Sequence, residues 1–276
     1  MGIGDSGERL GYIAATDGTP LYCICHEPRV LQKPPALIVP PLFEERKNAY
    51  ALLRRLAAKL CDAGHPVLRF DYRGSGESGG SGAHRRWTHL AEDLQTARRA
   101  LSDLSGCDDC ILLGARLGAT LALQSLLSAP ENSRTPIIAL APVLAGATQV
   151  RLWKMRSKIR AELTAAAGNS EVAAGSQQAN GSATLDFDGY AVDPDFFDDV
   201  AAIDLLKEAR ASGARVQLVQ ISHRTDIAPE FARLAESLGS QTSAMALRLE
   251  PFWEKLDDVD TLALENLVLQ AAAQTA

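Results

Sequence analysis

The sequence lacks any run of apolar residues approaching the roughly 18 that a membrane-spanning helix needs. Its beginning, residues 1–10, is polar and glycine-rich and contains no apolar secretory segment. Basic charge is not in excess either, because 28 Lys and Arg residues face 34 Asp and Glu residues, for a net charge of −6. No global field therefore attracts nucleic acid or anionic lipid. We expect a cytoplasmic globular protein without a nucleic-acid partner and without stable membrane insertion.

Cysteine is scarce, and its pattern predicts neither a disulfide framework nor a metal centre. The chain has five cysteines, an odd number that favours reduced thiols. Cys107 and Cys110 have the C-x-x-C spacing of redox motifs, but they run into an apolar strand instead of opening a helix. No second cysteine pair or histidine pair completes a zinc site. We interpret these residues as incidental thiols and expect no metal and no cofactor.

The sequence does contain a regular alternation of short apolar runs and helical patterns. Asp17-Gly18 separates the first two runs and is a typical hairpin turn. The expected strands are 10–14, 21–26, 36–39, 66–70, 110–113, 136–140, 215–221 and 245–249, and the expected helices are 47–63, 87–104, 117–128, 150–163, 229–238 and 259–273. Short connections between alternating elements favour parallel strands with right-handed crossovers. We predict an α/β fold with a doubly wound, mostly parallel sheet, whose site lies at the carboxyl ends of the strands.

The alternation breaks between residues 145 and 200, where we expect no buried strand. We predict that 146–199 form a helical cap insertion over the carboxyl edge of the sheet. The core is then formed by 1–145 and 200–276. Within the cap, 164–183 are rich in Ala, Gly, Ser, Gln and Asn and are expected to be flexible.

The cap also contains a basic helix, residues 150–163, with an apolar stripe. Such a helix could contact a membrane or a protein partner. An acidic run with interspersed aromatic residues, 186–199, lies in the same insertion. We therefore favour a solvated helix that packs through its apolar stripe and pairs with this acidic run.

The turn Gly114-Ala115-Arg116-Leu117-Gly118 follows an apolar strand and precedes a helix. In α/β hydrolases a sharp turn of this kind contains the motif G-x-S-x-G, with the nucleophilic serine at its centre. Here the glycines of the frame are present, and Arg116 stands in place of the serine. Arginine stays protonated and offers only hydrogen-bond donors, so it cannot attack a carbonyl.

The other members of a catalytic triad are also incomplete. On this fold they follow in the order Ser, then Asp or Glu, then His. Asp226 stands where the acid is expected, but no histidine occurs after His223. Ser75 or Ser78, in a glycine-rich loop, could replace the nucleophile with His223 as a displaced base, although a hydrogen-bonded loop histidine is the commoner case. The loss of both nucleophile and histidine argues against serine-type acyl transfer.

Charged and aromatic residues stand where the catalytic apparatus is missing. The Pro40-Pro41 pair removes two backbone donors from the loop in which an oxyanion hole is expected. Arg116 opens a helix, where free amides and the dipole favour an anion. It could bind a ligand carboxylate or phosphate, or pair internally with Glu44, Glu45 or Asp226. We give the internal pair somewhat more weight, because an unpaired buried charge is costly. The candidate ligand-binding residues are Arg116, Glu44, Glu45, Arg73, Phe43 and Trp253.

Several segments resemble a known group of proteins. Pro41-Leu42-Phe43-Glu44-Glu45-Arg46-Lys47-Asn48 is similar to the P-F-A-E-E-x-N-K segment of hydrolase-like proteins found beside exosortase (PEP-CTERM) systems, which also have G-x-R-x-G at the elbow. Pro142-Val143, Gly189-Tyr190 and Pro251-Phe252-Trp253 match the same group. The loop 71–78 is similar to the D-x-R-G-x-G-x-S loop of serine-aminopeptidase-like and lipase-like α/β hydrolases. The resemblance implies an α/β-hydrolase fold and a role in exopolysaccharide or protein-sorting loci.

Three functional hypotheses follow. The preferred one is a hydrolase-fold protein without serine-hydrolase activity, which binds a small anionic or acyl ligand or a partner protein, with Arg116 as the anchor. The alternative is an active hydrolase of ester, thioester or peptide bonds that uses a non-standard site, with Ser75, His223 and Asp226 as candidate catalytic residues. The third is a structural subunit that contacts a protein partner through the basic helix of the cap.

Overall fold

The computed structural model describes residues 2–3, 7–30, 33–130, 133–166, 185–187, 189–255 and 259–275. In this part of the chain, nine strands form one sheet in the order β1-β2-β3-β5-β4-β6-β7-β10-β11. The strands are β1 (Gly2–Ile3), β2 (Glu8–Ala14), β3 (Pro20–His26), β4 (Ala36–Val39), β5 (Val67–Phe70), β6 (Ile111–Ala115), β7 (Ile137–Leu140), β10 (Val216–Ser222) and β11 (Thr242–Arg248). The β1–β2, β2–β3 and β3–β5 pairs are antiparallel, and all later pairs are parallel. The predicted mostly parallel sheet is confirmed.

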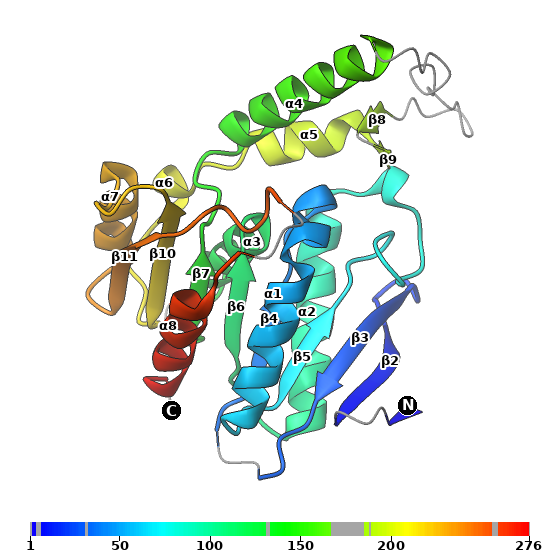
Figure 1. Ribbon diagram of the computed structural model, residues 1–276. Coiled ribbons are helices and arrows are strands. Elements are labelled where there is room, and N and C mark those ends of the chain that lie inside the picture. Colours follow the sequence, from blue (N-terminus) through cyan, green and yellow to red (C-terminus); the bar gives the residue numbers. More distant parts are fainter. Residues whose placement is uncertain are drawn as a thin grey trace.

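Helices cover both faces of this sheet (Figure 1). They are α1 (Phe43–Asp62), α2 (Trp87–Ser105), α3 (Leu117–Leu127), α7 (Pro229–Leu238) and α8 (Leu262–Ala273). The helices α1 and α8 share one apolar core with Ile38 and Leu113, whereas α2, α3 and α7 share another with Leu37 and Leu112. Neighbouring residues of β4 and β6 thus enter opposite cores. Burial on both faces is the reason why these strands are continuous apolar runs, and the doubly wound arrangement is confirmed.

The start of α1 differs from the prediction. The helix begins at Phe43, four residues before the expected position 47. Phe43 has a φ of 53°, so the chain turns sharply after Pro41 and enters the helix at once. The first turn contains Glu44 and Glu45, and acidic residues are favourable there because the helix dipole is positive at this end. The apolar period used for the prediction begins only after this acidic turn.

The cap contains more regular structure than the sequence predicts. Its elements are α4 (Gly146–Ala166), β8 (Leu185–Phe187), β9 (Tyr190–Val192) and α5 (Pro194–Ala201), and the short core helix α6 (Leu205–Glu208) follows and contacts α3 and α7. The strands β8 and β9 form an antiparallel hairpin. Phe187 and Val192 are buried, but Leu185 and Ala191 are exposed, so the region contains a short, partly buried hairpin that the sequence did not predict. Strands of three residues are too short to show an alternation of period two.

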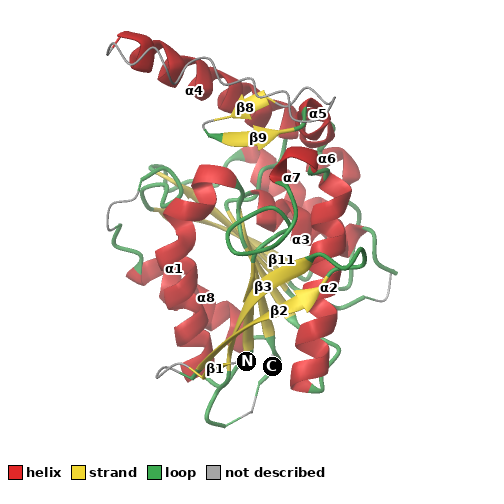
Figure 2. Ribbon diagram, turned by 90° about the vertical axis from the view of Figure 1, so that its right-hand side faces the viewer, coloured by secondary structure: helices red, strands yellow, loops and turns green. Residues whose placement is uncertain are grey.

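The helix α4 is longer than predicted. It begins at Gly146 and continues through 164–166, which are part of the segment expected to be flexible. The rest of that segment, 167–183, lies outside the described residues. Figures 1 and 2 both show α4 as the outermost element, above the carboxyl ends of the parallel strands. None of the helices in the described ranges is long and apolar enough to cross a membrane.

The packing of α4 is the reverse of the prediction. Val150 and Trp153 are buried and join the core below the helix. The predicted stripe is exposed, and it consists of Leu152, Met155, Ile159 and Leu163. Asp195 and Asp199 of the acidic run form ion pairs with Arg86, which precedes α2. The expectation that α4 packs through its stripe is therefore wrong.

Gly118 fixes how closely α3 approaches the sheet. A Cβ atom on this residue would overlap the carbonyl oxygens of Val39 and Pro40. Because backbone atoms cannot move aside cheaply, we expect Gly118→Ala to lower the free energy of unfolding by about 3 kcal/mol in urea denaturation. Gly213→Ala is the matched control, because a Cβ there meets nothing within 4 Å and stability should change by less than about 0.5 kcal/mol. Equal losses in the two variants would contradict the close packing at Gly118.

Candidate functional site

The turn between β6 and α3 keeps the backbone of a nucleophile elbow. Arg116 has φ 54° and ψ −125°, a conformation that residues other than glycine rarely adopt. Gly118 lies against the end of β4, and a Cβ on Gly114 would overlap the Cα of Ala119. The two glycines therefore still do what this motif requires, and the strained central position is held by an arginine.

The guanidinium of Arg116 has four hydrogen bonds within the chain. Nε and Nη2 donate to the two carboxylate oxygens of Glu45, at 3.3 and 3.4 Å. Nη2 also donates to Oε1 of Gln149 at 2.9 Å, and Nη1 donates to the carbonyl oxygen of Ala141 at 3.1 Å. Gln149 Nε2 donates in turn to Glu45 Oε1 at 3.2 Å. Of the two arrangements considered for Arg116, the geometry is that of the internal pair, with Glu45 as its acid.

This pair is largely removed from water. The side chains of Arg116 and Glu45 are only 15% and 7% exposed. Two unlike charges attract each other more strongly in such a place than in bulk solvent, but each has also lost its hydration. Either side chain left without the other would therefore be an uncompensated, partly buried charge.

Trp253 covers the face of the guanidinium. Its ring centroid lies 4.6 Å from Cζ of Arg116, within the range of a cation–π interaction. Asn48 donates from Nδ2 to the carbonyl oxygen of Trp253 at 2.9 Å, and Phe252 packs edge-on against the indole. Trp253 follows β11, the last strand, after which the histidine of a triad is expected. An indole thus contacts the elbow side chain from the segment in which a triad histidine is expected.

Sequence reasoning missed two residues of this arrangement, Gln149 and Asn48. Gln149 is 5% exposed and lies one turn before the buried Trp153 on α4. No motif marks it, although its spacing places it on the inward face of the helix. Asn48 follows Glu45 by three residues on α1, so both side chains point from the same face. That spacing within the E-E-x-x-N segment could have revealed Asn48.

The two loop serines are already engaged in hydrogen bonds. Ser75 Oγ accepts from Arg85 Nη2 at 2.6 Å. Ser78 Oγ donates to the carbonyl oxygen of Asp71 at 2.7 Å and accepts from the backbone N–H of Tyr22 at 2.8 Å. These contacts tie the β5–α2 loop to β3 and to the segment before α2. The structure thus gives both hydroxyl groups a role in holding the loop.

His223 and Asp226 lie together in the exposed loop after β10. Arg224 Nε donates to Asp226 Oδ1 at 3.2 Å, and this hydrogen bond lowers the pKa of the Asp226 carboxyl. Asp226 is therefore paired with a neighbour in its own loop instead of with Arg116 or with an imidazole. Its side chain is 62% exposed, so the pair has little structural weight.

Phe43 lies at the centre of an aromatic cluster between α1 and the cap. Its ring makes edge contacts with Trp153, Phe187, Tyr190 and Phe196, at centroid distances of 5.2 to 5.9 Å. Edge-to-face contacts of this kind add to the burial of apolar area. The residue that we expected to line a ligand pocket therefore packs the cap against the core.

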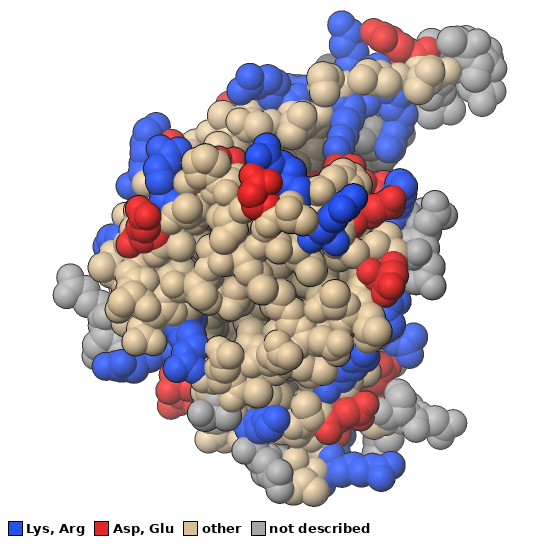
Figure 3. Space-filling view, turned by 60° about the vertical axis from the view of Figure 1, so that its left-hand side comes forward, with Lys and Arg blue, Asp and Glu red and all other residues tan. Residues whose placement is uncertain are grey.

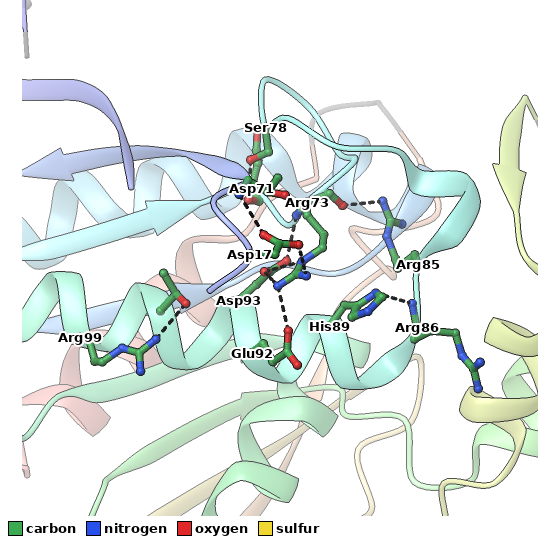
Figure 4. A network of polar contacts seen from close by, with 12 residues as sticks. Asp17, Asp71, Arg73, Ser78, Arg85, Arg86, His89, Glu92, Asp93 and Arg99 are labelled. Atoms are coloured by element: carbon green, nitrogen blue, oxygen red, sulfur yellow. Dashed lines mark hydrogen bonds and ion pairs between the residues drawn. The ribbon is translucent and has the colours of Figure 1, made fainter. Parts of the chain in front are cut away.

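Arg73 belongs to a separate network beneath the β5–α2 loop (Figure 4). Its Nε donates to Asp93 Oδ1 at 2.8 Å, and its backbone N–H donates to Asp93 Oδ2 at 2.9 Å. Asp17 and Glu92 complete the set at 2.9 and 3.1 Å. Burial raises the pKa of Asp93, and the hydrogen bonds from Arg73 oppose that rise.

Glu44 is also separate from the elbow. It pairs at 3.3 Å with Lys47, its neighbour on α1, and it is 38% exposed. Glu45 and Trp253 are thus the two candidate residues that the structure brings to Arg116. Within the described ranges, no group of three His, Cys, Asp or Glu side chains is placed to hold a metal ion, and the five cysteines are free thiols.

The sheet order, the helices on both faces and the strand–turn–helix elbow define an α/β hydrolase. A model of the family described as serine aminopeptidase, S33, matches residues 45–243. This range covers most of the chain, including the elbow and the whole cap. The chain therefore belongs to this family.

Solved structures show the same fold at low sequence identity. Alpha/beta hydrolase domain-containing protein 10 from mouse is 17% identical, with a TM-score of 0.58 and 97% of this chain and 98% of that chain covered. The esterase domain of a Rhodothermus marinus protein is 20% identical, with a TM-score of 0.62 and coverage of 96% and 98%. Proline iminopeptidase of Mycobacterium smegmatis is 13% identical, with a TM-score of 0.60 and coverage of 96% and 98%. No curated protein matches the chain.

Proposed function

We propose that this member of the serine aminopeptidase family has no serine-hydrolase activity and acts by binding. The observation that carries the proposal is the elbow, where Arg116 is bonded to Glu45 and covered by Trp253. Acyl transfer on this fold needs a nucleophile in contact with a general base. The elbow instead holds a cation whose donors are directed at groups of the same chain.

A relocated triad receives little support from the topology. The loop of Ser75 follows β5 and the loop of His223 follows β10, with β4, β6 and β7 between these strands. Four inter-strand steps of about 4.8 Å place the two strand ends about 19 Å apart. A nucleophile and its base must be within hydrogen-bonding distance, so both loops would have to fold inward over the sheet. The active-hydrolase alternative is therefore the weaker proposal.

The geometry also bears on what is bound. A small anionic or acyl ligand at Arg116 would have to displace Glu45 or Trp253, because the carboxylate pairs with the guanidinium and the indole covers its face. The aromatic cluster around Phe43 packs the cap against the core. We propose that the partner contacts the outer surface of the cap instead, and that the elbow arginine holds the cap in place through Gln149.

Within the family, we propose that the chain belongs to the hydrolase-like group found beside exosortase systems. The segments that suggested this resemblance are far apart in the sequence, yet several meet in space. Glu45 and Asn48 of the P-F-A-E-E-x-N-K-like segment contact Arg116 of G-x-R-x-G and Trp253 of the Pro-Phe-Trp segment. One interaction network therefore accounts for three of the motifs by which the group was distinguished.

A fluorophosphonate probe tests the absence of activity. We expect no labelling of the native protein above that of the heat-unfolded protein, because no activated serine is present. Arg116→Ser should also remain unlabelled, since Trp253 contacts the elbow from the segment in which a histidine would have to activate the new hydroxyl. Labelling is measured by intact-protein mass spectrometry beside an active serine hydrolase as positive control.

The same experiment includes variants that address the alternative. Stoichiometric labelling of the native protein, lost in Ser75→Ala or His223→Ala with folding preserved, would overturn the proposal. Ser128→Ala serves as the matched serine control, because Ser128 ends α3 away from the candidate loops. Labelling that appears only in Arg116→Ser would show that the fold still supplies a base, and it would contradict the role given to Trp253.

A further inference from the structure

The helix α4 has two apolar faces. Val150 and Trp153 form the inner face and are buried against the cap. The outer face consists of Leu152, Met155, Ile159 and Leu163, which are between 39% and 67% exposed. These four residues recur at spacings of three, four and four, so they form one continuous stripe along the helix. A stripe of four large apolar side chains on an outermost helix needs a partner to cover it.

Basic residues flank this outer stripe on both sides. At 100° per residue, Arg151 and Lys158 lie along one edge, and Arg156 and Arg160 lie along the other, where Arg156 also pairs with Glu254 at 2.6 Å. Lys154 lies nearer the inner face, with its Nζ over the ring of Phe197. Glu162 is the one acidic residue of the helix, so five basic residues give it a net charge of +4 in a chain whose net charge is −6. The positive charge is thus concentrated on α4 against the overall sign of the protein.

The position of α4 leaves its outer side accessible. The helix lies above α5 and the β8–β9 hairpin and extends beyond the rest of the molecule (Figures 1 and 2). In the space-filling view, basic and uncharged side chains lie along the arm at the top of the molecule, and acidic atoms appear towards its outer end (Figure 3). A flat surface could therefore approach the stripe along the length of the helix without meeting the core.

We propose that α4 is an interfacial helix that docks the protein on an anionic lipid surface. The apolar stripe enters the boundary between headgroups and acyl chains, and the helix lies in the plane of the membrane. The basic residues on both edges then reach the anionic headgroups, with their aliphatic stems along the apolar layer. This deepens the proposed function by naming the surface that the cap contacts, but an active hydrolase could dock in the same way.

Charge complementarity favours lipid over a protein groove. Basic side chains on both edges of an apolar stripe match a surface that is anionic on every side, whereas a groove would need acidic rims at two fixed positions. The rest of the chain is acidic and would be repelled by the same surface, so α4 is the one described helix suited to this contact. Its length, 21 residues from Gly146 to Ala166, is ample for an in-plane helix.

Vesicle flotation tests the proposal with the full chain. The probes are large unilamellar vesicles of phosphatidylcholine alone and of phosphatidylcholine with phosphatidylglycerol at a ratio of three to one. We expect binding to the anionic vesicles, little binding to the zwitterionic ones, and a loss of binding as salt concentration rises. The double variant Met155→Ser/Ile159→Ser should bind about tenfold more weakly or worse, and Arg151→Gln/Lys158→Gln about thirtyfold more weakly.

Matched variants separate the stripe from general changes of the surface. Leu262→Ser removes a side chain that is 57% exposed on α8, and Arg233→Gln removes an exposed charge on α7; both should bind as the unmodified chain does. Equal and weak binding to both kinds of vesicle overturns the proposal. So does binding that the charge variant loses and the stripe variant keeps, because that is adsorption without insertion. A dimer in size-exclusion chromatography that Met155→Ser/Ile159→Ser dissociates, without vesicle binding, would assign the stripe to a second copy of the chain. The fluorophosphonate result does not affect any of these outcomes.

Discussion

Replacing Arg73 by alanine is expected to lower the free energy of unfolding by about 3 to 5 kcal/mol, because it leaves a buried carboxylate without its cation. Asp93 has no exposed area, and two of its hydrogen bonds come from Arg73. The backbone N–H of residue 73 remains in the variant and can compensate only in part. Urea denaturation followed by circular dichroism measures the loss.

The pH dependence of this loss follows from the sign of the pKa shift. Burial raises the pKa of Asp93 above 3.8, and Arg73 opposes the rise. Without Arg73 the folded-state pKa rises further, so the buried carboxylate penalises folding at every pH above that raised value. The penalty disappears as the pH falls through the raised pKa towards 3.8, because the carboxyl of the folded state then becomes protonated and no longer carries a buried charge. We therefore expect the difference between Arg73→Ala and the unmodified chain to shrink on acidification.

Two comparisons make this prediction specific. In the double variant Arg73→Met/Asp93→Leu no unpaired charge remains, so its loss should be smaller than that of Arg73→Ala. Arg9→Ala breaks an ion pair with Glu27 in which both side chains are over 40% exposed, and it should cost less than about 1 kcal/mol. A loss in Arg73→Ala that equals the Arg9→Ala value, or that grows on acidification, would contradict the buried-pair account.

The fold could be predicted because its signals are local. Residues 36–39 and 110–113 are continuous apolar runs, as strands buried on both faces must be, and the structure forms β4 and β6 there. The elbow was visible because Gly114 and Gly118 stand at the two positions where a Cβ would collide with backbone. Two glycines four residues apart, between an apolar strand and a helix, are enough to identify such a turn.

The site could be predicted only in part, because its contacts join distant segments. The sequence indicated that Arg116 faces either a ligand or an internal carboxylate, and it named three acids. The choice of Glu45 depends on how α1 and the elbow meet across 71 residues of sequence. The outward direction of the α4 stripe could not be predicted either, since periodicity shows which residues share a face and does not show which face is covered. In the structure the face of α4 that contains Trp153 is covered, because the indole packs into the aromatic cluster around Phe43.

Removing the acid of the elbow is the second large effect that we expect. Glu45→Ala should lower the free energy of unfolding by about 3 kcal/mol, because Arg116 then remains partly buried with neutral partners only. Arg116→Ala should cost a similar amount, since Glu45 keeps only the amide of Gln149. The double variant Glu45→Ala/Arg116→Ala should cost clearly less than the sum of the two single variants, because it removes both charges and leaves neither of them unpaired.

The backbone of the elbow allows a further separation of causes. At φ 54° an alanine is strained, whereas glycine adopts this conformation without cost. Arg116→Gly should therefore be about 1 kcal/mol more stable than Arg116→Ala, although both lose the same hydrogen bonds. Urea denaturation of the two variants measures the strain of alanine minus the larger backbone entropy that glycine loses on folding. If Arg116→Gly is no more stable than Arg116→Ala, the elbow has relaxed in the absence of the guanidinium. In that case it is the pair with Glu45, and not the glycine frame, that holds the turn in the shape of a hydrolase elbow.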